Sequence, residues 1–345
     1  MAQTLELGLD TFGDVTAGPE GALLPHDQVI RNVIAEAVLA DEVGLDFIGI
    51  GEHHREDFAV SAPDVVLAAI AGQTKRIRLG SAVTVLSSDD PVRVFQRFST
   101  LDAASSGRAE VILGRGSFTE SFPLFGLDLA DYDILFDEKL QLFTELLKEE
   151  PVTWAGRTRP RLDNKRIYPP TGSGRLPAWI AVGGTPESVV RAAHYGLPLM
   201  LAIIGGAPMN FAPFTDLYHR ALDQFGRPRL PIGAHSPGYI AATDEQAREE
   251  MWLPYADMQE RIGRERGWSR MSRAQFEAEA GPDGALFVGS PETVAAKIAK
   301  VAQGLGLSRF DLKYSLGTLS HEKLMSSIEL YGTKVAPLVR ELLAG

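Results

Sequence analysis

Three consecutive residues with ionisable side chains follow a short apolar segment near the N-terminus. Glu52, His53 and His54 come directly after DFIGIG (46–51). Imidazole exchanges protons near neutral pH, so a histidine at this position could act as a general acid or base. Successive side chains of a strand point to opposite faces, so only one of the two histidines can face a site at the strand's end if the strand persists. A hydrogen-bonded structural role is the alternative for either histidine.

Two segments further along the chain have the composition of anion-binding loops. Gly114 and Gly116 flank Arg115 at the end of AEVILGRG (109–116), and an arginine can bind a phosphate with two parallel hydrogen bonds. A tight glycine turn would have the same sequence, and the Gly-x-Gly-x-x-Gly frame of dinucleotide folds is absent. The other segment is AVGGTPES (181–188), in which a strand, a glycine pair and a helix start follow in order.

The start of that helix predicts a second anion contact. Thr185 or Gly184 would cap the helix, and the free N–H groups of its first turn would bind an anion. Ordinary N-capping is the alternative. In IRLGSAVTVL (77–86), the small residues Ser81 and Ala82 would let a flat ligand lie against the backbone, although a plain core strand has the same composition. Together these segments predict a cofactor that has an aromatic ring and a phosphate.

The composition excludes several other kinds of chemistry. The chain has no cysteine, so disulfides, thiolate nucleophiles, zinc–thiolate sites and iron–sulfur clusters are ruled out. The His-x-His spacing of barrel hydrolases is absent and the remaining histidines are scattered, so we predict no metal site. A formal net charge of −11 argues against nucleic acid or an anionic membrane as the main partner.

The elements that must position these residues alternate between short apolar strands and amphipathic helices. This order predicts an α/β protein with a closed parallel (β/α)8 TIM barrel, and an open doubly wound sheet is the alternative. The expected strands are 5–12, 46–51, 77–86, 109–116, 178–182, 197–204, 231–241 and 309–315. The expected helices are 27–43, 63–73, one beginning at Pro91, 133–149, 186–195, 208–225, 290–306 and 321–343.

Two segments depart from this alternation. Residues 150–177 lose helical periodicity and are expected to form an excursion with a hairpin, and residues 244–285 are polar and are expected to form an inserted helical or mobile segment. No Pro/Ser-rich linker divides the chain, so we expect residues 1–345 to form one barrel domain. No signal peptide or transmembrane segment is recognisable, and a cytoplasmic protein is expected.

In these motifs and their order, the sequence resembles the bacterial luciferase-like flavin-dependent monooxygenase family. The likeness extends from about residue 5 to 343. The motifs are EHH with the following REDF, GSAVTVL with DDPVRV, the run from GRAEVILGRGSF to LFG, GGTPES with AAHYGLP, VGSPETVAAKI, and SIELYGTKVAPLVRE. The resemblance implies a (β/α)8 barrel that binds reduced FMN without a covalent bond, while some close relatives use the deazaflavin F420.

The resemblance also implies roles for individual residues. His53 matches the family's catalytic histidine beside the reactive edge of the flavin, and Glu52 matches a carboxylate near the same site. Ala82 and Val83 match a pair under the isoalloxazine ring that is often joined by a cis peptide bond. The residues that match the family's cofactor loop, with Arg115 near the phosphate, are Gly114, Arg115, Gly116 and Ser117. Those that match its second phosphate-binding segment are Gly183, Gly184, Thr185 and Ser188.

Two positions depart from the light-emitting luciferase α subunits. Those subunits have a cysteine where Gly114 stands, so a thiol has no role here. The arginine that they place downstream for the flavin phosphate falls near Asp133, an acidic residue. Phosphate contacts are therefore expected to differ, and light emission is not predicted.

The resemblance implies a monooxygenase that uses reduced FMN and O2, through a C4a-hydroperoxyflavin, to oxidise a small organic substrate. NAD(P)H would reduce the flavin directly or through a separate flavin reductase, and the chain would form a homodimer. One alternative is F420-dependent hydride transfer, with a basic run available for the longer acidic tail of F420. Another is a non-catalytic flavin-binding protein, and ligand spacing disfavours a metal-dependent hydrolase. The basic run comprises Arg157, Arg159, Arg161, Lys165 and Arg166.

Overall fold

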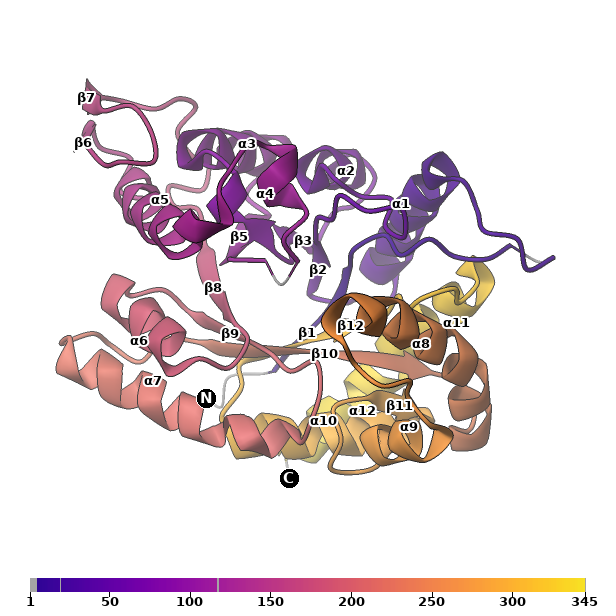
Figure 1. Ribbon diagram of the computed structural model, residues 1–345. Helices are drawn as coiled ribbons and strands as arrows, with labels where there is room; N and C mark the ends of the chain where they lie inside the picture. Colours follow the sequence, from indigo (N-terminus) through magenta and orange to yellow (C-terminus); the bar gives the residue numbers. More distant parts are fainter. Residues whose placement is uncertain (1–4, 19, 117, 345) are drawn as a thin grey trace.

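A ring of parallel strands forms the centre of the molecule (Figure 1). The computed structural model describes residues 5–18, 20–116 and 118–344. Within these residues eight strands pair in parallel, and the pairing of the first with the last closes the ring. The predicted (β/α)8 barrel is confirmed, and the open sheet is excluded. In ring order the strands are β1 (Glu6–Thr11), β2 (Phe47–Ile50), β3 (Arg78–Ser81), β5 (Ala109–Gly114), β8 (Ala178–Val182), β9 (Leu199–Ala202), β10 (Ile232–Ile240) and β12 (Arg309–Lys313).

Helices surround the ring on its outer side (Figure 1). Local sequence explains where several of them begin, because proline loses no N–H bond in the first turn of a helix. Pro63, Pro91, Pro186 and Pro291 all stand there, and the Asp90 carboxylate accepts bonds from two first-turn N–H groups of its helix. The helices are α1 (His26–Glu42), α2 (Pro63–Ala71), α3 (Pro91–Ala104), α5 (Tyr132–Leu146), α6 (Pro186–Tyr195), α7 (Ala212–Gln224), α10 (Pro291–Leu305), α11 (His321–Leu330) and α12 (Ala336–Ala344).

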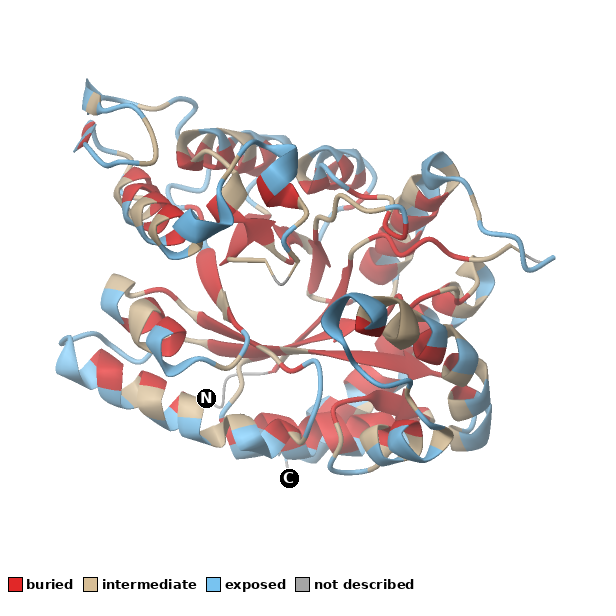
Figure 2. Cartoon of the chain, in the orientation of Figure 1, coloured by how far each residue is buried: buried red, intermediate tan, exposed pale blue. Residues whose placement is uncertain are grey.

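Apolar side chains fill the space between the strands and the helices. Figure 2 shows the strands and the inward faces of the helices as buried and the outer helix faces as exposed. This layer contains Leu, Ile, Val and Phe side chains from nearly every element. Its burial is the main favourable term for folding, because apolar surface leaves water on both faces of the layer.

Three segments differ from the sequence-based expectation. The expected strand 77–86 is interrupted at Ala82–Val83, so that β3 is followed by the two-residue β4 (Thr84–Val85) and a 3-10 turn, η1 (Leu86–Ser88). A short strand, β11 (Phe287–Gly289), extends the sheet beside β10 and was not expected. The expected helix 321–343 contains a π-helical turn, η4 (Tyr331–Val335), between α11 and α12.

The excursion at 150–177 contains the expected hairpin. Its strands, β6 (Val152–Trp154) and β7 (Leu162–Lys165), pair antiparallel and project away from the ring (Figure 1). The hairpin is attached to α5, because the Glu138 carboxylate accepts bonds from the backbone N–H groups of Arg157 and Thr158. Short helical turns connect the remaining elements at α4 (Ser121–Leu124), η2 (Leu129–Asp131) and η3 (Pro208–Phe211).

The inserted segment is helical. It forms α8 (Asp244–Arg266) and α9 (Arg273–Ala280), which confirms the first of the two expectations for this stretch. At the start of α8, the Asp244 carboxylate accepts bonds from the Ser290 N–H (2.6 Å) and the Thr293 hydroxyl (2.9 Å). Near its end, two guanidinium nitrogens of Arg55 bind the Glu265 carboxylate at 2.8 and 2.5 Å. The two ends of α8 are therefore attached to two different loops.

The inside of the barrel is buried but charged. Arg309 on β12 binds Glu110 on β5, the strand directly across the ring, and also the Asp311 carboxylate. The Arg309 guanidinium lies over the Phe47 ring at 3.5 Å and over the Trp179 ring at 5.1 Å. Among the described residues, no helix has both the length and the apolar character needed to span a membrane.

Candidate active site

One mouth of the barrel collects the residues that the sequence singles out. Because the ring strands are parallel, their carboxyl ends all open on the same side. The segments that follow β2, β3, β5 and β8 carry the predicted residues there (Figure 1). Ser117 lies outside the described residues. The predicted residues that the structure places at these four strand ends are Glu52, His53, Ala82, Val83, Gly114, Arg115, Gly116, Gly183, Gly184, Thr185 and Ser188.

Three phenylalanine rings surround the imidazole of His53. The ring centroids of Phe12, Phe58 and Phe118 lie 5.0, 4.4 and 4.9 Å from it. The backbone is also held, because the His53 N–H donates to the Val60 carbonyl at 3.0 Å. The imidazole therefore sits in an apolar box at the strand ends, where water is largely excluded.

A carboxylate completes this box. The Nδ1 atom of His53 lies 3.0 Å from Oε1 of Glu120, which comes from the loop after β5. Sequence analysis did not single out Glu120, because nothing local connects it to a histidine 67 residues away. The imidazole of His54 instead packs edge-on against Phe125 at 5.1 Å, and burial lowers its pKa below the usual 6.5. The two neighbouring histidines thus have different partners.

Glu52 holds the loop that follows the break in β3–β4. Its Oε1 accepts a hydrogen bond from the Val85 N–H at 2.7 Å. Burial raises the pKa of this carboxyl to about 7, and the Asp89 carboxylate contributes to the rise. Glu52 therefore exchanges a proton near neutral pH while it fixes the end of the Ala82–Val83 segment.

The Ala82–Val83 dipeptide lies between two glycines of neighbouring strands. Its peptide bond is cis. A Cβ atom on Gly51 would stand 2.5 Å from the Ala82 carbonyl oxygen, and one on Gly114 would stand 2.5 Å from Cγ2 of Val83. Only glycine leaves room for this approach. Packing against Val83 therefore explains why position 114 carries no side chain, and no ligand is needed to account for it.

Arg115 is already paired within the chain. Its Nη1 donates to Oδ1 of Asp133 at 2.8 Å, and its guanidinium lies 5.2 Å from the centre of the Tyr132 ring. The Tyr132 hydroxyl donates in turn to the Gly116 carbonyl at 3.0 Å. Asp133 stands near the position where the luciferase α subunits have an arginine. It is thus the direct partner of Arg115, the residue predicted to bind the phosphate.

The start of α6 lacks a side-chain cap. Thr185 occupies the N-cap position, as expected, but its hydroxyl accepts no bond from a first-turn N–H and instead donates to the Ser188 hydroxyl at 2.8 Å. No described atom lies within 4 Å of the place where a Cβ of Gly183 would stand. Pro186 has no N–H, and the N–H groups of Ser188 and Val189 bond to the Thr185 carbonyl at 3.2 and 3.4 Å. The start of α6 therefore offers an anion the Glu187 N–H and the open space beside Gly183.

A second arginine stands beside this helix start. Arg191, one turn beyond Ser188, donates to the Ser188 hydroxyl at 3.3 Å and pairs with Asp137 at 2.8 Å. Asp133 and Asp137 are one turn apart on α5. One binds Arg115 and the other binds Arg191. Sequence analysis did not single out Arg191. Its position three residues after Ser188, on the same face of one helix, could have indicated it.

These donors match what a phosphate-bearing cofactor requires. Uncapped helix N–H groups, hydroxyls and guanidinium groups are the usual partners of a phosphate. The Ala82–Val83 segment lies at the same mouth, packed between Gly51 and Gly114. Within the described residues, no group of three His, Cys, Asp or Glu side chains comes together in the manner of a metal site.

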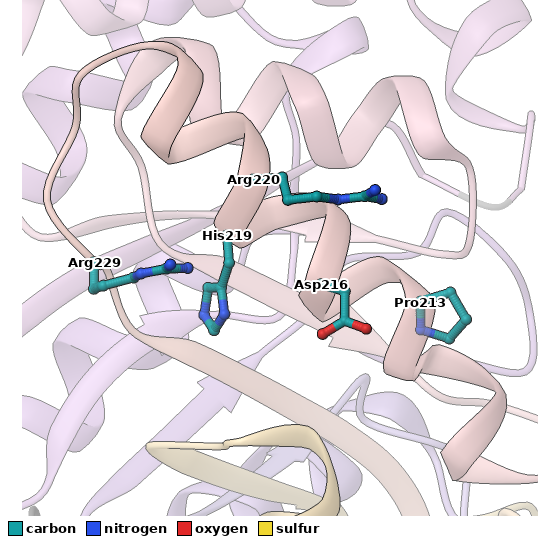
Figure 3. A pocket seen from close by; sticks show the side chains of 5 residues that line it. All are labelled: Pro213, Asp216, His219, Arg220 and Arg229. Carbon is teal, nitrogen blue, oxygen red and sulfur yellow. The ribbon is translucent and has the colours of Figure 1, made fainter.

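A further hollow of the described surface lies elsewhere. A groove of about 500 Å³ runs along the outer face of α7 and the segment before β10 (Figure 3). Its lining side chains extend from α7, except for Arg229, which belongs to the segment before β10 and is paired with Asp223 at 3.0 Å. The lining residues are Pro213, Asp216, His219, Arg220 and Arg229. Their open arrangement offers no chemistry comparable to that of the barrel mouth.

Comparison with known proteins identifies the family of the chain. Residues 11–309 match the family model described as luciferase-like monooxygenase. The 4-hydroxyprotoasukamycin monooxygenase of Streptomyces nodosus subsp. asukaensis is 27% identical over 317 residues, which are 86% of this chain and 83% of that protein.

Solved structures share the fold. The oxygenating constituent of 3,6-diketocamphane monooxygenase from Pseudomonas putida, solved with FMN, is 21% identical with a TM-score of 0.77, covering 97% of this chain and 98% of that chain. The coenzyme F420-dependent tetrahydromethanopterin reductase from Methanopyrus kandleri is 17% identical with a TM-score of 0.72, covering 97% and 99%. The fold thus accommodates both cofactors. The matched family model covers most of the chain, and the protein belongs to the luciferase-like monooxygenase family.

Proposed function

We propose that the protein is a flavin-dependent monooxygenase that uses reduced FMN and O2 to oxidise a small organic substrate. One observation carries the proposal. One mouth of the barrel holds three features: a histidine enclosed by phenylalanine rings, the Ala82–Val83 segment packed against glycines, and hydrogen-bond donors suited to a phosphate. Each of these features is common alone. Together, at four strand ends, they suit a flavin, which has both a planar ring and a phosphate.

The phosphate of FMN would be held by the start of α6, the Thr185 and Ser188 hydroxyls, and the two arginines at α5. The planar ring would lie on the Ala82–Val83 segment. When bound in its reduced form, FMN supplies the electrons that activate O2. We expect NAD(P)H to provide them, directly or through a separate reductase, and the chain to act as a homodimer.

The chain's own residues would control water and protons. The rings of Phe12, Phe58 and Phe118 would keep bulk water from His53 and from the reacting atoms beside it. His53 would take up and return a proton as oxygen is transferred or water is released. Glu52 would keep the Ala82–Val83 segment in place through its bond to the Val85 N–H.

F420-dependent hydride transfer is the alternative within the same fold. It needs cations for the acidic tail of F420, and the hairpin is the basic segment of the chain. Several of its arginines already have partners: Arg159 binds Asp90 at 3.0 Å, and Arg161 binds Asp163 at 3.4 Å. Anaerobic titrations with reduced FMN and reduced F420 separate the two, and tighter binding of F420 would replace the proposal.

The proposal is tested by His53→Ala. We expect the variant to bind FMN within about twofold of the parent and to lose roughly 100-fold or more in substrate-dependent O2 uptake, because general acid–base catalysis contributes on that scale. FMN affinity is measured by anaerobic titration, and turnover by oxygen electrode with candidate substrates.

The matched control is His219→Ala, which removes a histidine from the groove on α7, far from the strand ends. It should change neither quantity. Turnover of His53→Ala within about twofold of the parent would remove His53 from the mechanism. Failure of the parent chain to bind either cofactor would remove the proposed function itself.

A further inference from the structure

Glu120 is the polar partner of the boxed histidine. Its Oε1 lies 3.0 Å from Nδ1 of His53, and the two side chains are only 19% and 11% exposed. Glu120 comes from the loop after β5, whereas His53 follows β2, so the contact joins two separate segments of the mouth. Limited access of water strengthens a charge-assisted bond of this kind and keeps its geometry fixed.

The charge state of Glu120 decides which nitrogen of His53 carries a proton. Burial tends to raise the pKa of this carboxyl, but hydrogen bonds from the His53 ring and from the backbone at Glu120 and His54 outweigh burial and hold the pKa below its usual range. Glu120 is therefore ionised near neutral pH. An ionised carboxylate can only accept, so Nδ1 must donate, and in the neutral imidazole Nε2 is left without a proton.

The surrounding rings keep the imidazole from turning away. Phe12 and Phe118 meet it edge-on at interplanar angles of 83° and 85°, and Phe58 lies against it at 34°. Phe118 belongs to the same loop as Glu120, so this one loop supplies both a wall of the box and the acceptor for Nδ1. Rotation of the ring would break the bond to Glu120 and disturb all three contacts.

We propose that Glu120 is a positioning residue that fixes His53 in the Nδ1–H tautomer and leaves Nε2 as the atom that exchanges protons during turnover. The role of Nε2 in turnover rests on the proposed function, whereas the tautomer of His53 does not. A proton that is taken up at Nε2 forms an imidazolium, whose charge faces the Glu120 carboxylate. The same proton leaves from Nε2 later in the cycle, so Glu120 stays ionised throughout.

The tautomer is measured directly by 15N NMR of the histidine side chains in the apoprotein at pH 7.5, with His53 identified by the loss of its signals in His53→Asn. We expect Nδ1 to carry the proton in the parent. In Glu120→Gln the amide can present either an acceptor or a donor to Nδ1, so the Nδ1–H form should lose its dominance. Turnover should fall roughly 100-fold, on the scale of general acid–base catalysis, with FMN affinity within about twofold.

Glu56→Gln is the matched control, because Glu56 is an exposed carboxylate on the same loop as His53. It should leave the tautomer and turnover unchanged. A parent protein with the His53 proton on Nε2 would overturn the inference, even if Glu120→Gln failed to fold. A changed tautomer with turnover kept within about twofold would overturn the positioning role. A parent with the expected tautomer but no turnover would overturn the proposed function and support the tautomer assignment.

Discussion

The inside of the barrel and the layer outside it are both buried, but they are built from different chemistry. The outer layer, between strands and helices, is a continuous apolar core. The inside has a small apolar cluster and several buried pairs of ionisable side chains: Arg309 with Glu110 and Asp311, His235 with Asp10, and Lys313 with Asp14. The cluster consists of Phe47, Ile112, Trp179 and Met200. The two regions therefore have different roles. The outer layer stabilises the ring, and the interior sets the electrostatic environment below the mouth.

Strand β12 shows both regions side by side. Phe310 and Leu312 are fully buried in the apolar layer, while Arg309 and Asp311 between them face the interior. Burial raises the pKa of Asp311 to about 6 although Arg309 opposes the rise. Charges held this way lose hydration, which their partners must replace.

The largest effect is expected from breaking the interior charge group. Arg309→Met removes the cation and leaves Glu110 and Asp311 buried without it, so we expect a loss of about 3–5 kcal/mol in the free energy of unfolding. Urea unfolding measures the loss. Adding Glu110→Gln and Asp311→Asn to the same chain removes the uncompensated charges and should recover most of it.

Leu312→Ala is the control from the other face of the same strand. It should cost about 2–5 kcal/mol through lost contacts and a cavity, and no second polar substitution should restore it. A loss below about 1 kcal/mol for Arg309→Met would mean that the interior charges do not depend on their cation. The contrast between the two regions would then fail.

A smaller effect, which depends on pH, is expected at the mouth. The pKa of Glu52 in the folded chain is about 7, above its ordinary 4.5, so the native state keeps this proton after the unfolded chain has lost it. Its stabilising contribution is present below about pH 4.5 and disappears as pH rises through 7. Glu52→Gln still accepts from the Val85 N–H and carries no charge, so it should be more stable than the parent at pH 8 by about 1–3 kcal/mol and similar at pH 4.

Thermal unfolding at the two pH values measures this difference, and Glu56→Gln provides the exposed comparison. Equal stability of Glu52→Gln and the parent at pH 8 would show that the Glu52 carboxyl is ionised at no cost. The mouth would then resemble the outer surface and not the interior.

The smallest effect on stability is expected at an exposed ion pair that, like Arg309 with Asp311, joins an arginine to an aspartate. Asp133 pairs with Arg115, but its side chain is 78% exposed. Water and salt screen such a pair, so Asp133→Ala should change the free energy of unfolding by less than about 1 kcal/mol. Urea unfolding beside Arg309→Met tests this directly. A loss as large as that of Arg309→Met would show that burial does not distinguish the two pairs.

The outer layer was largely predictable from the sequence, because its signals are local. Prolines at Pro63, Pro91 and Pro186 mark helix starts, and apolar periodicity marks the faces that pack. The expected helix at 186–195 agrees with α6, and the hairpin at 150–177 was expected. The apolar run continues through Ala82–Val83 and gave no sign of the strand break there, although the family resemblance implied the cis peptide bond that the pair has.

The polar contacts of the site could not be predicted in the same way. The pairs His53–Glu120 and Arg309–Glu110 join residues 67 and 199 positions apart. No local period links such residues, and only closure of the ring brings them together. Family resemblance located His53, Arg115 and the start of α6. The partners that orient them came from the three-dimensional arrangement alone.

The attachment of α8 at its two ends has a consequence for how the medium acts on the protein. The bond to Arg55 at its far end is ionic, and the Glu265 side chain is 50% exposed, so dissolved salt weakens it. The bonds of Asp244 at the near end go to an amide and a hydroxyl and respond much less to salt. We therefore expect rising ionic strength to weaken the contact of α8 with Arg55 more than its contacts with Ser290 and Thr293.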